Sequence, residues 1–134
     1  MVKRSSFGSF GARPFGMKPP KVPKLQEPAA PRNLIFETRL CNAIRARVIV
    51  KLKYEDDTAY RTFEPHAVYC STKDKYCVAG QQVDNPTDPI ERDVPKNFEV
   101  GKISALQVTD DPFTPDPRFD RYDAKYANGI VCSI

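Results

Sequence analysis

Four cysteines and one histidine are the residues of this sequence whose chemistry suits metal binding or nucleophilic attack. The cysteines, Cys41, Cys70, Cys77 and Cys132, form no C-x-x-C pair, so the spacing typical of a structural zinc site is absent. A site made of His66, Cys70 and Cys77 lacks a fourth ligand. We therefore predict no metal ion and interpret the cysteines as small buried thiols. A disulfide between Cys70 and Cys77 is possible if the two residues pair across a hairpin. An intracellular setting favours free thiols instead.

The groups that could perform catalysis do not form a recognisable motif. His66 follows Pro65, and no serine or aspartate stands at the spacing of a catalytic triad, so we interpret it as a loop histidine without a catalytic role. Adjacent acids such as Asp56 and Asp57 would point to opposite faces of a strand, which favours solvated turn residues. No glycine-rich phosphate-binding motif occurs. The sequence therefore predicts a protein that is not an enzyme and needs no cofactor.

Basic and aromatic side chains are the remaining candidates for recognition chemistry. They come from different predicted strands and loop ends, and could converge on one face of a sheet. There the cations would meet phosphates and the rings would meet bases. The alternative is that the lysines only solvate loop ends while the tyrosines pack at the rim. The residues concerned are Arg61, Lys75, Lys96, Lys102, Tyr60, Tyr69 and Tyr76.

The N-terminal 32 residues differ in composition from the rest of the chain. Residues 1–32 hold seven basic residues and one acid, Glu27, which gives this arm a net charge of +6 within a whole-chain charge of +4. They also hold six prolines and three glycines, so we expect a disordered arm. Phe7, Phe10 and Phe15 stand next to glycines and could stack on bases. An inert solvated tail is the alternative.

The elements that must position these residues begin with a helix. Asn33 can cap it, and Phe36, Leu40 and Ile44 recur at one buried stripe, which predicts a helix over 34–46. The period then changes to two, as a half-buried strand requires. Pro65 is predicted to end the second strand, Cys70 to lie opposite Cys77, and residues 84–97 to form a long irregular loop. The predicted strands cover 47–54, 60–64, 67–70, 75–80 and 103–108.

Short strands joined by hairpins favour a small antiparallel barrel, because closing the sheet removes its exposed edges. After residue 113, Phe119, Tyr122 and Tyr126 recur at helical spacing, so a short helix could dock its aromatic edge on the barrel. Residues 130–134 could add an edge strand. The predicted organisation is an arm over 1–32, one folded domain over 33–113 with its leading helix, and a C-terminal extension over 114–134.

Four segments in order resemble the WYL domain, a small SH3-like or Sm-like β-barrel. Over 40–54 a helix leads into an apolar strand, and residues 61–68 are similar to the family's R-x-V-x-P-x-x-L segment. Residues 75–77, Lys-Tyr-Cys, fall on the Trp-Tyr-Leu tripeptide for which the family is named. Residues 96–103 are similar to the closing R-x-F-x-L-D-R-I. The resemblance covers about 40–113. It implies a mainly β fold, an SH3-like or Sm-like barrel of about five antiparallel strands preceded by one helix.

The sequence departs from that family pattern at several positions. Lys75 and Cys77 stand for Trp and Leu, Gly101 for Asp, and Lys96 and Lys102 for arginines. Lysine keeps the charge but loses the bidentate fork. The family's domain usually follows a DNA-binding winged helix and senses a nucleic acid or nucleotide in bacterial transcription regulation. An arm of 32 residues cannot hold a winged helix, so the resemblance implies a stand-alone module.

We therefore expect a non-enzymatic ligand-sensing regulatory or accessory module that recognises single-stranded nucleic acid or a nucleotide. Arg61, Lys96 and Lys102 are the predicted anion contacts, Tyr76 is the predicted stacking group, and no cofactor is expected. A protein–protein interaction module that uses the barrel edge or the Pro-rich arm is the alternative. The sequence has neither a secretory signal nor an apolar run long enough to span a membrane, so we expect a cytoplasmic protein.

Overall fold

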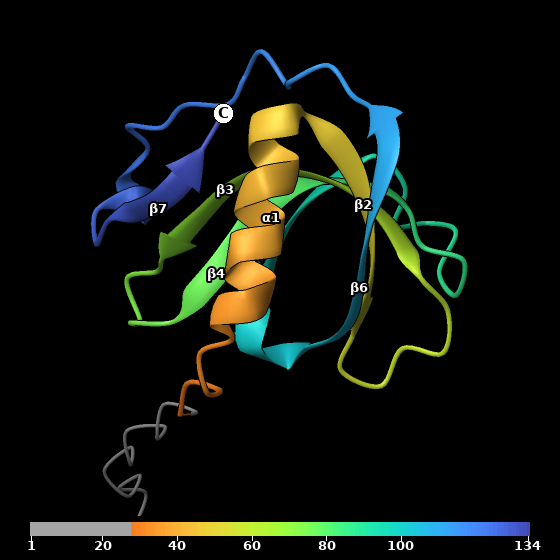
Figure 1. Cartoon of the computed structure of the whole chain (residues 1–134), viewed down its shortest axis with the longest axis horizontal. Helices are drawn as coiled ribbons and strands as arrows, with labels where there is room; N and C mark the ends of the chain where they lie inside the picture. The colour runs from red at the N-terminus through yellow and green to blue at the C-terminus, as the bar shows by residue number, and fades with distance from the viewer. Residues whose placement is uncertain (1–27) are drawn as a thin grey trace, which may run out of the picture.

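The computed structural model describes residues 28–134, which form one helix and a β-sheet (Figure 1). Within this part of the chain, helix α1 comes first, the strands follow, and two short 3₁₀ turns interrupt them. The mainly β class with a leading helix is therefore confirmed. The elements are α1 (Leu34–Ala46), β2 (Val48–Tyr54), β3 (Arg61–Cys70), β4 (Tyr76–Asp84), β5 (Val94–Glu99), η1 (Val100–Lys102), β6 (Ile103–Pro112), η2 (Ala124–Tyr126) and β7 (Ile130–Ser133).

The six strands form one antiparallel sheet that is open. Five of them lie in the order β5-β4-β3-β2-β6, and β7 pairs with β3. The outer strands β5 and β6 follow one another through η1 but form no ladder, so the expected closure into a barrel does not occur. The prediction of disorder for residues 1–27 lies outside the described residues.

Helix α1 has the predicted bounds and the predicted cap. The Asn33 side chain accepts a hydrogen bond from the Phe36 backbone N–H at 3.0 Å, which satisfies a donor that the first turn leaves free. The helix ends at Arg47, whose φ of 55° lies in the left-handed region. Leu40 and Ile44 are fully buried, because α1 lies across one face of the sheet (Figure 1) and supplies Leu40, Cys41, Ala43 and Ile44 to the main core.

Strand β3 corrects the prediction that Pro65 ends a strand. One edge of β3 pairs with β2 through residues 61–63 and then with β7 through residues 67–69. Pro65 lies between these two partners, and a register shift against β4 occurs at the same place. A proline is tolerated at such a bulge because no ladder partner needs its missing N–H. The two predicted strands are therefore one continuous strand.

Strand β5 begins inside the segment 84–97, which was predicted to be an irregular loop, and continues to Glu99. Its residues pair with β4 from Cys77↔Glu99 to Gln82↔Val94, which leaves only residues 85–93 without strand structure. The hairpin register of β3 and β4 also differs from the prediction. Cys70 lies opposite Tyr76, and Cys77 lies opposite Tyr69, so the cysteines do not form the expected pair.

The C-terminal extension packs on the face of the sheet that α1 does not cover. The expected helix is reduced to η2, and Tyr122 is 86% exposed, whereas Phe119 and Tyr126 pack with Tyr69 in a second apolar cluster. Most of the extension consists of turns because Asp116, Asp120 and Asp123 accept hydrogen bonds from backbone N–H groups two residues later. The expected edge strand is present as β7.

A disulfide joins α1 to β7, and its partners differ from those considered from the sequence. Cys41 is bonded to Cys132, while Cys70 and Cys77 are free and partly buried. The two bonded residues are 91 positions apart. They meet because β7 extends the sheet beside β3, directly beneath α1. The interpretation of all four cysteines as thiols is therefore wrong for Cys41 and Cys132.

Candidate functional site

Arg61 begins β3 and is held by side chains of the described chain. Its Nε and Nη2 donate to the two carboxylate oxygens of Asp57 at 2.6 and 3.0 Å, and Nη1 donates to Gln82 Oε1 at 3.2 Å. The side chain is 14% exposed, and its guanidinium lies 5.4 Å from the centre of the Phe98 ring. These hydrogen bonds lower the pKa of Asp57. Arg61 thus closes the β2–β3 turn.

Lys96, on β5, forms an ion pair with Glu91 in the preceding loop. The hydrogen bond from Lys96 lowers the pKa of Glu91. Gln82 links this pair to Arg61, because its amide nitrogen donates to the Glu91 carbonyl oxygen at 2.6 Å while its amide oxygen accepts from Arg61. The structure therefore brings Arg61 and Lys96 together, with a carboxylate beside each of them.

Lys102 lies in η1 beside a buried carboxylate, that of Glu99. Lys102 Nζ is 3.9 Å from Glu99 Oε1, and Lys75 Nζ is 4.0 Å from the same oxygen. The other oxygen of Glu99 accepts a hydrogen bond from the Ala30 backbone N–H at 2.6 Å. Lys102 also lies 3.9 Å from Glu55. Glu99 thus connects β5, the β3–β4 turn and the segment before α1.

Tyr76 begins β4 and supports a stacked guanidinium. Arg32 lies over the ring with its guanidinium carbon 3.5 Å from the ring centre. Two hydrogen bonds from Arg32 to the carboxylate of Glu37, at 2.8 and 3.0 Å, fix the guanidinium plane. The Arg32 side chain is 41% exposed, whereas that of Glu37 is 4% exposed. Residues 28–32, assigned to the arm from the sequence, therefore contact the folded part.

The four predicted ligand residues fall into two groups. Tyr76 and Lys102 belong to the end of the sheet where the described chain begins, and we call this the arm-side surface. Lys96 lies opposite Gly80, and Arg61 contacts Gln82, six positions along β4 from Tyr76. That separation is about 20 Å along an extended strand, so one pocket cannot hold all four. The arm-side surface consists of Arg32, Lys75, Tyr76, Glu99 and Lys102.

Arg32 and Glu99 of the arm-side surface were neither predicted ligands nor candidates for recognition, whereas Lys75 was a candidate only. Arg32 was counted only as part of the charge of the arm. Its position just before the helix cap, five residues from Glu37, is a local signal that the two could form an ion pair. Glu99 has a local partner in Lys102, three positions on, but no sequence signal relates it to Ala30 and Lys75, which lie 69 and 24 positions away. Only the folded arrangement brings them together.

His66 is buried in β3, which corrects its assignment to a loop. The Asp116 backbone N–H donates to Nε2 at 3.0 Å, so Nε2 must be an acceptor, and Nδ1 then donates to the Glu64 carbonyl oxygen at 2.8 Å. The ring lies between Phe113 and Phe119, with centroids 5.2 and 5.7 Å away. The imidazole joins the C-terminal extension to the sheet.

Within residues 28–134, no three histidine, cysteine or acidic side chains come together in a way that could hold a metal ion. In the same part of the chain, no helix is both long and apolar enough to cross a membrane. No protein-family model matches the sequence, and no curated protein matches it.

Proposed function

We propose that the chain is a non-enzymatic, WYL-like recognition module that binds single-stranded nucleic acid or a nucleotide at the arm-side surface. The observation that carries this proposal is the exposed guanidinium of Arg32, held flat on the Tyr76 ring by its two hydrogen bonds to Glu37. An immobilised guanidinium plane is a surface on which an unpaired base stacks. Its rigidity lowers the entropy that binding would otherwise cost.

The charges around the stack support an anionic ligand. Lys75 and Lys102 lie 4.0 and 3.9 Å from one oxygen of the buried Glu99 carboxylate, so two positive charges are close to the stack. The acids Glu37, Glu55 and Glu99 nearly balance these local cations. The positive excess comes from residues 1–31, whose sequence carries a net charge of +5 when Arg32 is counted with the surface. In this proposal Arg61 and Lys96 stabilise the fold and do not contact the ligand.

Fluorescence anisotropy with labelled oligo(dT) and oligo(U), measured over a series of salt concentrations, tests the proposal. The full chain should bind at low salt and lose affinity linearly on logarithmic axes. Replacing Lys18, Lys21 and Lys24 with glutamine should flatten the slope by about 2, since each phosphate contact on a single strand contributes about 0.7.

The Arg32→Lys variant separates stacking from charge. Lysine keeps the charge but lacks the plane, so affinity should fall about fivefold or more with the salt slope unchanged. Lys51→Gln, which removes an exposed lysine from β2, is the matched control and should leave both quantities nearly unchanged. Absence of binding at low salt, or an Arg32→Lys variant with wild-type affinity, would contradict the proposal.

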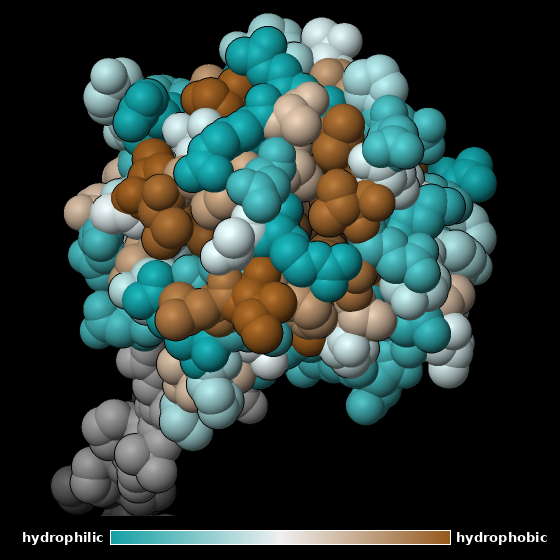
Figure 2. Space-filling model, in the orientation of Figure 1, coloured by the Kyte–Doolittle hydropathy of each residue, from teal (hydrophilic) through white to brown (hydrophobic). Residues whose placement is uncertain are grey.

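A protein-interaction module is the second candidate, and exposed apolar side chains favour it. Leu34 and Ile35 at the start of α1 are 60% and 73% exposed, and Val131 on β7 is 45% exposed. Figure 2 shows several apolar groups on this face with polar side chains between them. Such small separate groups are common on monomeric proteins. Binding to a protein partner with almost no salt dependence would favour this function.

A further inference from the structure

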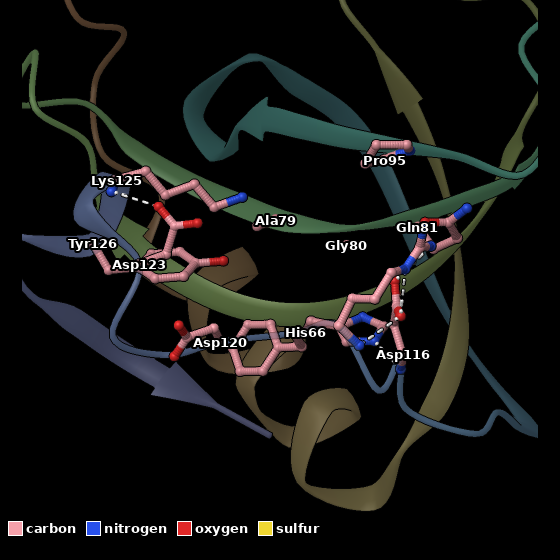
Figure 3. A pocket seen from close by; sticks show the side chains of 12 residues that line it. His66, Ala79, Gly80, Gln81, Pro95, Asp116, Asp120, Asp123, Lys125 and Tyr126 are labelled. Atoms are coloured by element: carbon pink, nitrogen blue, oxygen red, sulfur yellow. Dashed lines mark hydrogen bonds and ion pairs between the residues drawn. The ribbon is translucent and has the colours of Figure 1, made fainter.

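A pocket of about 270 Å³ lies on the face of the sheet that α1 does not cover. The sheet side of the pocket consists of Ala79 and Gly80 on β4, together with Pro95 on β5, and the C-terminal extension forms the opposite side (Figure 3). The small side chain of Ala79 leaves room between the sheet and the extension. None of the residues predicted to bind a ligand lines this pocket.

Tyr126 places a buried hydroxyl in this pocket without a partner. The residue is 6% exposed, and its ring packs against Tyr69 and Phe119, with centroids 4.8 and 6.0 Å away. Figure 3 shows the hydroxyl pointing into the pocket. No group within the described residues 28–134 forms a hydrogen bond with it. Buried tyrosine hydroxyls usually have a partner, so this hydroxyl is available to form a hydrogen bond with a ligand in the pocket.

Two carboxylates of the extension lie beside the hydroxyl. Asp120 Oδ1 accepts the Tyr122 N–H at 2.9 Å, and Asp123 Oδ1 accepts the Lys125 N–H at 3.0 Å. Within the described chain, the second oxygen of each is not engaged. Burial, followed by the charges of Asp123 and Asp120, raises the pKa of Tyr126 to about 12. Asp120, Asp123 and Tyr126 all line the same pocket.

The third carboxylate of the pocket is already occupied. Both oxygens of Asp116 accept hydrogen bonds from the Arg118 guanidinium at 3.1 Å. That pair therefore adds little net charge, and the field in the pocket is set by Asp120, Asp123 and the single cation Lys125. The free acceptors are two carboxylate oxygens and one phenolic oxygen.

We propose that this pocket binds the ammonium group of a small alkylamine. An ammonium group has three N–H donors, which matches the three free acceptors of Asp120, Asp123 and Tyr126. The rings of Phe119 and Tyr126 and the methyl group of Ala79 provide an apolar surface for the alkyl chain, and aromatic faces attract cations. An anionic ligand would face two unpaired carboxylates.

Lys125 is an internal competitor for the same acceptors. Its side chain runs along the pocket in Figure 3, and Nζ lies 5.2 Å from the centre of the Tyr126 ring. Removing this charge should therefore strengthen the binding of an amine. It would weaken the binding of an anion, so the sign of the change identifies the charge of the ligand.

NMR titration of the ¹⁵N-labelled full chain with n-butylammonium tests the proposal, with n-butyrate and n-butanol as comparison ligands. We expect saturable shifts of the Gly80 and Tyr126 amides with n-butylammonium alone. Tyr126→Phe, which removes only the hydroxyl, should weaken binding about fivefold. Asp123→Asn, which keeps the oxygen that caps η2, should weaken it about tenfold.

The remaining variants complete the test. Lys125→Met, which keeps most of the aliphatic stem, should bind n-butylammonium severalfold more tightly. Asp56→Asn removes an exposed acid from the β2–β3 turn and should change nothing. Equal responses to the three ligands, tighter n-butyrate binding, or wild-type affinity in both Tyr126→Phe and Asp123→Asn would overturn the proposal. The amide spectrum of each variant reports whether it folds.

Discussion

At the scale of single residues, the buried charges of this protein are held by groups from distant parts of the sequence. Glu99 is the main example, since it accepts the Ala30 N–H and lies near Lys75 and Lys102. A buried carboxylate is stable only when hydrogen bonds and opposite charges replace its water. Glu99 therefore fixes the segment before α1 against the end of the sheet, and with it the Arg32–Tyr76 stack.

The Asp57–Arg61 pair makes the free energy of unfolding depend on pH. Hydrogen bonding to Arg61 lowers the pKa of Asp57 below its ordinary value of 3.8. The unfolded chain therefore binds more protons as the pH falls, so the stabilisation is present above about pH 4 and is lost as the pH approaches the folded pKa.

Urea unfolding of the wild type and Asp57→Asn measures this contribution. The wild type should be more stable by about 1–3 kcal/mol at neutral pH. The difference between the two proteins should shrink as the pH is lowered below about 4. A difference that does not vary with pH would show that the charge of Asp57 is unimportant.

Gly80 is required where β4 crosses the bulge at Pro65. A Cβ at this position would lie 2.1 Å from the Glu64 carbonyl oxygen and 2.7 Å from the Phe63 ring. Backbone cannot move away as a flexible side chain can, so Gly80→Ala should cost about 3 kcal/mol. Urea unfolding checks this value, with Gln81→Ala as a control that should change stability by less than about 0.5 kcal/mol. A stable Gly80→Ala variant would mean that the bulge is adjustable.

At the scale of elements, β7 depends on two connections. It has four residues, pairs only with β3, and is bonded to α1 through Cys41–Cys132. So short a strand buries little apolar surface of its own. The disulfide therefore holds the C-terminal strand beside β3 and keeps the main core covered at that side.

The double variant Cys41→Ser/Cys132→Ser should lose about 2–4 kcal/mol of stability, because the disulfide closes a long loop. Hydrogen exchange should show faster exchange of the β7 amides than of the β2 amides in this variant. The Cys70→Ser/Cys77→Ser variant, which removes the free thiols, is the control. Equal protection of β7 in wild type and variant would show that strand pairing alone is sufficient.

Sequence patterns predict an element correctly where the cap and the hydrophobic period of that segment alone specify its structure. Asn33 and the stripe of Leu40 and Ile44 define α1, and alternation defines β2. Strand β5 was missed because Pro95 and the polar residues around it hide its pairing with β4. Pro65 was misinterpreted for a related reason. Strand β3 changes its partner from β2 to β7 at this position, and this depends on contacts between distant segments that no neighbouring residue indicates.

At the scale of the whole molecule, the candidate site could be predicted only in part. Tyr76 and Lys102 do share one surface, but Arg61 and Lys96 lie beside other carboxylates. Sequence patterns identify which residues carry charge, whereas the pairing of those charges depends on contacts between distant segments. Cys41–Cys132 belongs to the same class of contact. Disulfides persist mainly in oxidising compartments, and a cytoplasmic location stays a prediction.

The two proposed binding surfaces have opposite electrostatic character. The arm-side surface adjoins a segment with a net charge of +6, whereas the pocket near Tyr126 contains two carboxylates without a salt-bridge partner in the described chain. Each surface would therefore repel the ligand of the other. The strands β3 and β4 separate them, and the chain can be tested for the two ligands independently.

The openness of the sheet has a consequence for how copies of this protein meet at high concentration. An unpaired outer strand is a template on which a strand of a second molecule can add, and this is a route to aggregation. Here both outer strands carry residues that disfavour such pairing. Pro95 and Lys96 lie within β5, while β6 ends in Asp110, Asp111 and Pro112. Proline and charged side chains at the outer strands therefore oppose the addition of a strand from a second molecule.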